Sequence, residues 1–161
     1  MENLKYNIQD LLKLLTPDME KYFLRKLPGE TTETIKLKVA EFLKFCLVPN
    51  FKHNVPFNDE IDEIWHLWIL QTQQYRELMD ALPYKTFLDH SSDDYGDKES
   101  LDQKEEINNQ ISFLATYVYH FGSFTLNSLP FWPFANRLFY KFEKNIDRLN
   151  SYLKNLAIKY A

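Results

Sequence analysis

Apolar residues recur at intervals of three and four positions along most of the chain, which is the spacing of one helix face. Between residues 4 and 15, leucines and one isoleucine stand at this spacing. The same spacing predicts further helices over about residues 17–27, 32–47, 58–79, 100–121 and 138–156. The pattern therefore predicts an all-α fold, a compact single-domain bundle of about six helices spanning residues 1–161.

Capping residues place the ends of several of these helices. Thr16, followed by Pro17, is a typical helix start, because the hydroxyl accepts from a free backbone N–H and proline fits the first helical position. Asn58 has the same role before the fourth helix, and Ser100 opens a capping-box pattern before the fifth. Gly122 is a natural helix stop. The acidic, polar stretch over about residues 91–100 predicts a flexible exposed loop.

Composition restricts the classes of protein that fit. The chain has 161 residues, 3 Gly and 7 Pro, which corresponds to one domain and excludes collagen-like and low-complexity architectures. A net charge of −4 argues against a nucleic-acid protein that binds by neutralising phosphates. The sequence contains no stretch of about 18 consecutive apolar residues, so it predicts no membrane span. The single Cys46 favours a reducing compartment, and the amphipathic first residues show no secretion signal, so we expect a cytoplasmic location.

The predicted helix over residues 58–79 carries the most informative side chains. Ile61, Trp65, Trp68, Thr72, Tyr75 and Met79 share one face, which we expect to be core. Asp62 and His66 lie four positions apart at the border of that face, so they are neighbours. Such a pair can be a structural hydrogen bond, half of a metal site, or an acid–base pair in which Asp62 orients His66.

His90 extends this pair toward a metal site. It closes the segment of residues 83–90 just past the fourth helix and is followed by Asp93 and Asp94. If the chain returns toward the helix, His66, His90 and Asp62 provide ligands for a divalent ion such as zinc, and Asp93 or Asp94 supports a bound water. The structural pair remains the simpler interpretation of the spacing alone.

The segment from Pro56 to His90 resembles the glycine-rich domain-containing protein-like family. The resemblance rests on Asp62-x-x-Trp65-His66, on Tyr75 ten positions after the tryptophan, and on a closing Leu-x-His turn that ends at His90. Flanking similarity extends it to about residues 37–134, in the manner of a small bacterial-type member. The resemblance implies that these five residues belong to one constellation, although the biochemical activity of that family is not settled.

The chain also departs from the family pattern. Many members carry a second histidine two positions after the first, where this chain has Trp68. A cysteine that often follows the tyrosine is missing, and so is the glycine-rich segment. The first two departures remove candidate metal ligands.

Other candidate residues have simpler explanations. Cys46 stands in helical register between apolar neighbours, which is typical of a buried small side chain rather than a nucleophile. His120 falls in the last turn of its helix, where a cation interacts well with the dipole, and His53 lies in a loop. Phe131 and Trp132 form an aromatic loop that either completes the core or binds a partner.

These features lead to two hypotheses from different classes. The first is a binding or interaction module with a polar pocket around Asp62, His66 and His90, whose ligand is a protein segment or a small molecule. The second is a metal-dependent enzyme or metal-binding protein that uses the same residues. No nucleic-acid partner is expected, because the basic residues do not form a stripe.

Overall fold

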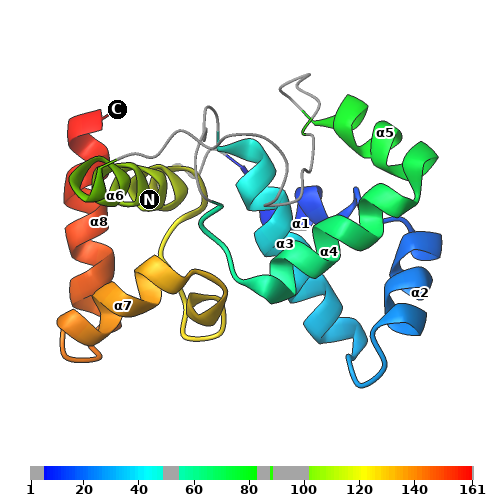
Figure 1. The fold of residues 1–161 in the computed structure, drawn as a ribbon, viewed down its shortest axis with the longest axis horizontal. Helices are drawn as coiled ribbons and strands as arrows, with labels where there is room; N and C mark the ends of the chain where they lie inside the picture. Colours follow the sequence, from blue (N-terminus) through cyan, green and yellow to red (C-terminus); the bar gives the residue numbers. More distant parts are fainter. Residues whose placement is uncertain (1–5, 49–54, 83–87, 89–101, 161) are drawn as a thin grey trace. The chain divides into compact units, whose positions relative to one another are not determined.

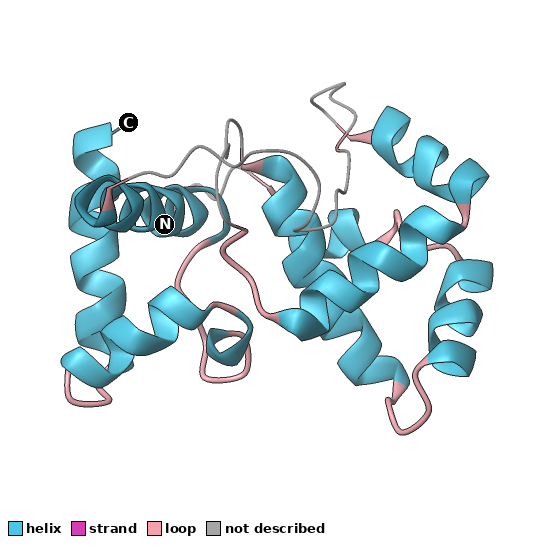
Figure 2. Cartoon of the chain, viewed as in Figure 1, coloured by secondary structure: helices cyan, strands magenta, loops and turns pink. Residues whose placement is uncertain are grey.

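The computed structural model describes residues 6–48, 55–82, 88 and 102–160. Within these residues every regular element is a helix and none is a strand, which confirms the all-helical prediction (Figures 1 and 2). Eight α-helices and one short 3-10 helix occur in this part of the chain, compared with the six or so predicted. Their bounds are α1 Ile8–Leu12, α2 Pro17–Lys26, α3 Thr32–Leu47, α4 Asp59–Leu70, α5 Thr72–Ala81, α6 Gln103–Phe121, η1 Leu129–Phe131, α7 Pro133–Lys141 and α8 Ile146–Tyr160.

The chain divides into two compact units. One unit contains α1 to α5, from residues 8–47 and 59–97, and is called the α1–α5 unit. The other contains α6, η1, α7 and α8, from residues 1–7, 48–58 and 98–161, and is called the α6–α8 unit. The expectation that residues 1–161 form a single domain stays a prediction.

Aromatic rings form the core of the α1–α5 unit. The Trp68 ring lies 5.5 Å from the ring of Phe23 on α2 and 5.9 Å from that of Phe42 on α3. The Trp65 ring lies 5.9 Å from Phe42 and 5.5 Å from Phe45. Helix α3 keeps its predicted bounds, and the Thr16 hydroxyl caps α2 by accepting from the Met19 amide at 3.2 Å. The helical spacing read from the sequence therefore gives the correct core face in this unit.

The prediction of one helix over residues 58–79 is wrong, because Gln71 divides it into α4 and α5. The Gln71 amide bonds to the Trp68 carbonyl at 3.0 Å, and the Gln71 carbonyl then accepts from the Tyr75 amide at 2.8 Å, so a new helix begins there. The expected core residues Ile61, Trp65, Trp68, Tyr75 and Met79 are buried. Thr72 is exposed, contrary to expectation, because it now stands at the first position of α5.

The last predicted helix is also two helices, α7 and α8. Between them, Glu143 and Lys144 have φ of 56° and 58°, a left-handed conformation that is unfavourable for residues with a Cβ. The side chain of Asn145 accepts from the Arg148 amide at 3.1 Å and so caps the start of α8. Capping and packing of α8 thus outweigh the local preference for one continuous helix.

The α6–α8 unit is built around α6 and α8, which lie beside each other in Figure 1. Helix α6 is capped by Asp102, which accepts from the Glu105 amide at 2.8 Å, and not by Ser100, which lies outside the described residues. Gly122 ends α6 as predicted, with φ of 89° and its amide bonded to the Val118 carbonyl at 2.9 Å. Within the described ranges, no helix is long and apolar enough to cross a membrane.

Candidate functional site

The residues of the sequence constellation fall into a buried set and an accessible set. Trp65 on α4 and Tyr75 on α5 are 6% and 2% exposed. Asp62 is half-buried and His66 is exposed, one turn apart on α4. His90 lies outside the described residues. The structure therefore separates side chains that hold the fold from side chains that a ligand could reach.

A chain of hydrogen bonds connects the buried set. The Trp65 Nε1–H donates to the Tyr75 hydroxyl at 3.0 Å, and this hydroxyl donates in turn to the backbone carbonyl of Leu88. The Leu88 amide lies 3.5 Å from the Met79 sulfur. We call the Trp65–Tyr75–Leu88 series the indole–phenol tie. The tie and the Met79 sulfur together hold both backbone polar groups of Leu88, the residue two positions before His90, against α5.

The tie explains why a tryptophan and a tyrosine ten positions apart belong together. A buried indole or phenol normally finds a hydrogen-bond partner, because a buried unpaired donor costs about 1–3 kcal/mol. Here the Tyr75 hydroxyl accepts from the Trp65 indole across the break at Gln71 and donates its own proton to the Leu88 carbonyl, in the segment that follows α5. Periodicity placed Trp65 and Tyr75 on one face, but it gave no sign that they are hydrogen-bonded.

The metal-site prediction combines two residues that the structure describes, Asp62 and His66, with three that it does not. His90, Asp93 and Asp94 lie outside the described residues. Among the described residues no group of three or more His, Cys, Asp or Glu side chains could hold an ion. The proposed zinc site at His66, His90 and Asp62, with Asp93, therefore stays a prediction.

The α1–α5 unit also contains a cavity that the sequence did not indicate. Its volume is about 220 Å³. Trp68 lines it and is 1% exposed, and its Nε1–H has no hydrogen-bond acceptor in the described part of the chain. The other lining residues are Lys13, Leu14, Thr16, Met19, Gln74, Glu77, Leu78 and Ala81. Trp68 thus occupies the position of the missing second histidine as a core side chain, and Asp62 and His66 are not part of this cavity.

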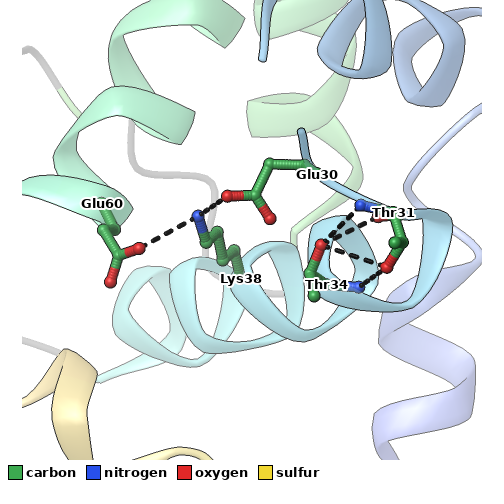
Figure 3. A network of polar contacts seen from close by, with 5 residues as sticks. All are labelled: Glu30, Thr31, Thr34, Lys38 and Glu60. Carbon is green, nitrogen blue, oxygen red and sulfur yellow. Dashed lines mark hydrogen bonds and ion pairs between the residues drawn. The ribbon is translucent and has the colours of Figure 1, made fainter. Parts of the chain in front are cut away.

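A second feature missed by the sequence reading is a nearly buried lysine between two carboxylates (Figure 3). Lys38 Nζ lies 2.6 Å from Glu30 and 3.2 Å from Glu60, so it joins the segment before α3 to the start of α4. Its side chain is 8% exposed. Thr31 and Thr34 bond to each other beside it and close the first turn of α3. A lysine within the apolar stripe of α3, between Ile35 and Phe42, was the signal that could have identified this ion pair.

The ion pair predicts a pH dependence of stability. The hydrogen bond from Lys38 lowers the pKa of Glu30, so its contribution to stability is present above its unfolded pKa and is lost as pH falls through the lower folded value. For Lys38, desolvation lowers the pKa, but the hydrogen bonds that its ammonium donates to Glu30 and Glu60 outweigh it and the net shift is upward. The Lys38 contribution is therefore complete below its unfolded pKa and is lost as pH rises through the higher folded one.

We expect Glu30→Gln to lower the free energy of unfolding by about 1 kcal/mol near neutral pH, because Glu30 is partly solvated and the ion pair is only partly buried. The difference from the natural chain should shrink as pH falls and vanish below the lowered folded pKa of Glu30, where the side chain is protonated in both states. Urea unfolding at several pH values measures this directly. Glu33→Gln, at an exposed position in the first turn of α3, serves as the control, and an equal effect there would contradict the assignment.

Cys46 is a free thiol on α3 without the surroundings of a nucleophile. Desolvation by the surrounding chain raises the pKa of the Cys46 thiol well above its ordinary value. The thiolate, which is the reactive form, is therefore scarce at neutral pH. This supports the expectation that Cys46 acts as a small packed side chain.

Alkylation provides a test of this conclusion. At pH 8 the folded protein should react with iodoacetamide more than about tenfold slower than free cysteine, because so little thiolate is present. Unfolding in urea should restore the ordinary rate. A folded-state rate equal to that of free cysteine would show that Cys46 is activated and would reopen the nucleophile interpretation.

Phe131 and Trp132, the candidates for binding a partner, are both buried. The Trp132 ring lies 5.4 Å from Phe113 and 5.3 Å from Tyr117, so the loop completes the core of the α6–α8 unit and is not an exposed patch. The loop is held by the Asn58 amide, which donates to the Phe131 carbonyl at 2.9 Å. Of the remaining histidines, His120 occupies the last turn of α6 as expected and is buried, and His53 lies outside the described residues.

Comparisons with known proteins add no assignment to this geometry. The chain matches no protein-family profile, no curated protein and no solved structure.

Proposed function

We propose that this chain is a small binding module whose ligand, a protein segment or a small molecule, contacts Asp62 and His66 on α4 together with His90. The observation that carries the proposal is the indole–phenol tie. Two buried polar side chains hold the backbone of Leu88 against α5, and the sequence continues from there to His90 within two residues. The resemblance to the glycine-rich domain-containing protein-like family groups the same positions.

The accessibility of the α4 flank supports binding at this place. His66 is exposed and Asp62 is half-buried, so a ligand can reach both without opening the core. The residues beneath them, Trp65 and Ile61, are buried and fix the helix surface on which the pair stands. The free thiol of Cys46 supports a reducing compartment such as the cytoplasm for this activity.

A metal-binding function is the second candidate, favoured by the accessible Asp62–His66 pair at i and i+4. In this alternative the pair and His90 hold zinc. A metal-binding protein takes up zinc, whereas a binding module of the first kind takes up an organic ligand. One set of titrations therefore separates the two candidates.

The test uses tag-free, isotope-labelled protein and follows backbone amide shifts by NMR. The probes are zinc chloride and, separately, a library of small carboxylate, amide and heteroaromatic fragments. The proposal expects fragments that shift the amides of residues 62–66 and that lose this effect in His66→Ala, while Glu63→Ala, an exposed neighbour, keeps it. Stoichiometric zinc uptake that His66→Ala abolishes would establish the metal function instead. Shifts at Trp68 and Gln74 only, or no shift with any probe, would refute a binding site at Asp62 and His66.

A further inference from the structure

Charge is distributed unevenly between the C-terminal helices and the rest of the chain. Residues 133–160, which contain α7 and α8, carry a net charge of +4 in a chain whose net charge is −4. Their basic residues are Arg137, Lys141, Lys144, Arg148, Lys154 and Lys159, and their acidic residues are Glu143 and Asp147. An excess of one sign on a single helical hairpin attracts a partner of the opposite sign.

Three of these cations are seated on aromatic rings. The Arg137 guanidinium lies 5.3 Å from the centre of the Phe134 ring, and the Arg148 guanidinium lies 5.6 Å from that of Phe142. The Lys144 ammonium lies 5.5 Å from the centre of the Tyr140 ring. A ring beneath a guanidinium limits its motion and leaves its in-plane N–H groups available, so less entropy is lost when it binds a carboxylate. We call these three pairs, together with the neighbouring Lys141, the basic–aromatic hairpin.

The cations of the hairpin are exposed and form none of the ion pairs in the described ranges. Arg137, Lys141, Lys144 and Arg148 are all exposed. None of the ion pairs in the part of the chain that the structure describes involves these four side chains. Their charge is therefore available to a partner.

Apolar surface accompanies the charge. Helix α7 buries only Ala135 among its nine residues. Tyr140 is 59% exposed, and Phe134 and Phe139 are half-buried. Arginine and aromatic side chains are the types enriched in the energetically important parts of protein–protein interfaces.

We propose that the basic–aromatic hairpin is a docking surface for an acidic segment of a partner protein. The cations offer hydrogen-bond donors at fixed positions, to which discrete carboxylates can pair bidentately. Single-stranded nucleic acid fits less well, because a cation already lies over one face of each of the three rings on which bases would stack. An anionic membrane fits less well too, because the exposed Glu143 and Asp147 stand among the cations and would be repelled by a continuous layer of headgroups. This inference concerns the α6–α8 unit and is independent of the site proposed on α4.

The test measures fluorescence anisotropy with a labelled peptide of about 12 residues, rich in Glu with interspersed Leu, against the full chain. A peptide with Gln in place of Glu is the uncharged probe. We expect binding of the acidic peptide that weakens with salt, and little binding of the Gln peptide. Arg137→Gln/Arg148→Gln should weaken binding by about tenfold or more, and Lys141→Gln/Lys144→Gln by a smaller factor.

The matched control is Arg25→Gln/Arg76→Gln, which removes two exposed arginines from the α1–α5 unit and so changes the net charge equally. It should leave the affinity within about twofold, because neither residue belongs to the hairpin. If the control variant and Arg137→Gln/Arg148→Gln weaken binding equally, the effect comes from net charge alone and the proposal is overturned. The absence of any peptide binding would also overturn it. Tighter, hairpin-dependent binding to oligothymidylate or to phosphatidylserine vesicles would overturn it in favour of those partners.

Discussion

Replacing Trp65 by alanine is expected to lower the free energy of unfolding by about 3–5 kcal/mol. The indole is 6% exposed and packs against the rings of Phe42 and Phe45, so its removal leaves a cavity in the core of the α1–α5 unit. It also removes the donor of the indole–phenol tie and leaves the Tyr75 hydroxyl without that bond. Chemical denaturation of both proteins measures the difference.

A second pair of variants separates the cavity from the tie. Tyr75→Phe keeps the ring and removes the hydroxyl, which leaves the Trp65 donor and the Leu88 carbonyl without it, and we expect a loss of about 1–3 kcal/mol. Trp65→Phe removes the donor and part of the ring. In a double-mutant cycle the two substitutions should couple by at least about 0.5 kcal/mol, because the second one removes a bond that the first has already broken. Strict additivity would show that the tie does not stabilise the protein.

As a control, Leu70→Ala at the 56% exposed end of α4 should change stability by about 0.5 kcal/mol or less.

Trp132→Ala is expected to have an effect of similar size, about 3–5 kcal/mol, in the α6–α8 unit. The side chain is 0% exposed and is enclosed by Phe113, Tyr117 and Phe124. Its removal takes the central ring from that cluster and leaves a space that the surrounding rings fill only in part. Thermal and urea unfolding, followed by circular dichroism, provide the measurement.

Tyr140→Ala is the matched control for Trp132→Ala, since it removes an aromatic side chain that is 59% exposed from the same unit. Its cost should stay within about 1 kcal/mol, because little buried surface is lost. A Trp132→Ala protein as stable as the Tyr140→Ala protein would show that the aromatic loop is not part of the core. It would restore the interpretation of Phe131 and Trp132 as an exposed patch for a partner.

The elements of the fold were predicted well where the signal is local. Helix α3 runs from Thr32 to Leu47 as expected, Thr16 caps α2, and Gly122 ends α6. These features depend on the spacing of apolar residues and on single capping residues, which act over one or two turns. Two helix breaks were missed, at Gln71 and at Glu143–Lys144, where none of the residues is a glycine or proline.

The candidate site was predicted less completely than the fold. The sequence identified Asp62, His66, Trp65 and Tyr75 as one group, and the structure joins Trp65 to Tyr75 directly. It gave no indication of the bond to Leu88, of the cavity beside Trp68 or of the cations seated on the rings of α7 and α8. The bond and the cavity depend on where side chains from different elements meet, which spacing along one helix does not determine.

The amino-acid sequence by itself therefore determines the helical character of this protein, the start of α2, both ends of α3, the end of α6 and many of the core-facing residues, because these follow from local propensity and amphipathic spacing. Tertiary structure alone decides where helices break, since a new helix begins at Gln71 through its backbone hydrogen bonds and at Asn145 through its side-chain cap, despite a continuous apolar pattern. It also decides what each polar side chain does. Lys38 is neutralised between two carboxylates, whereas Arg137 and Arg148 stay exposed on aromatic rings, because only the first lies where two other elements converge.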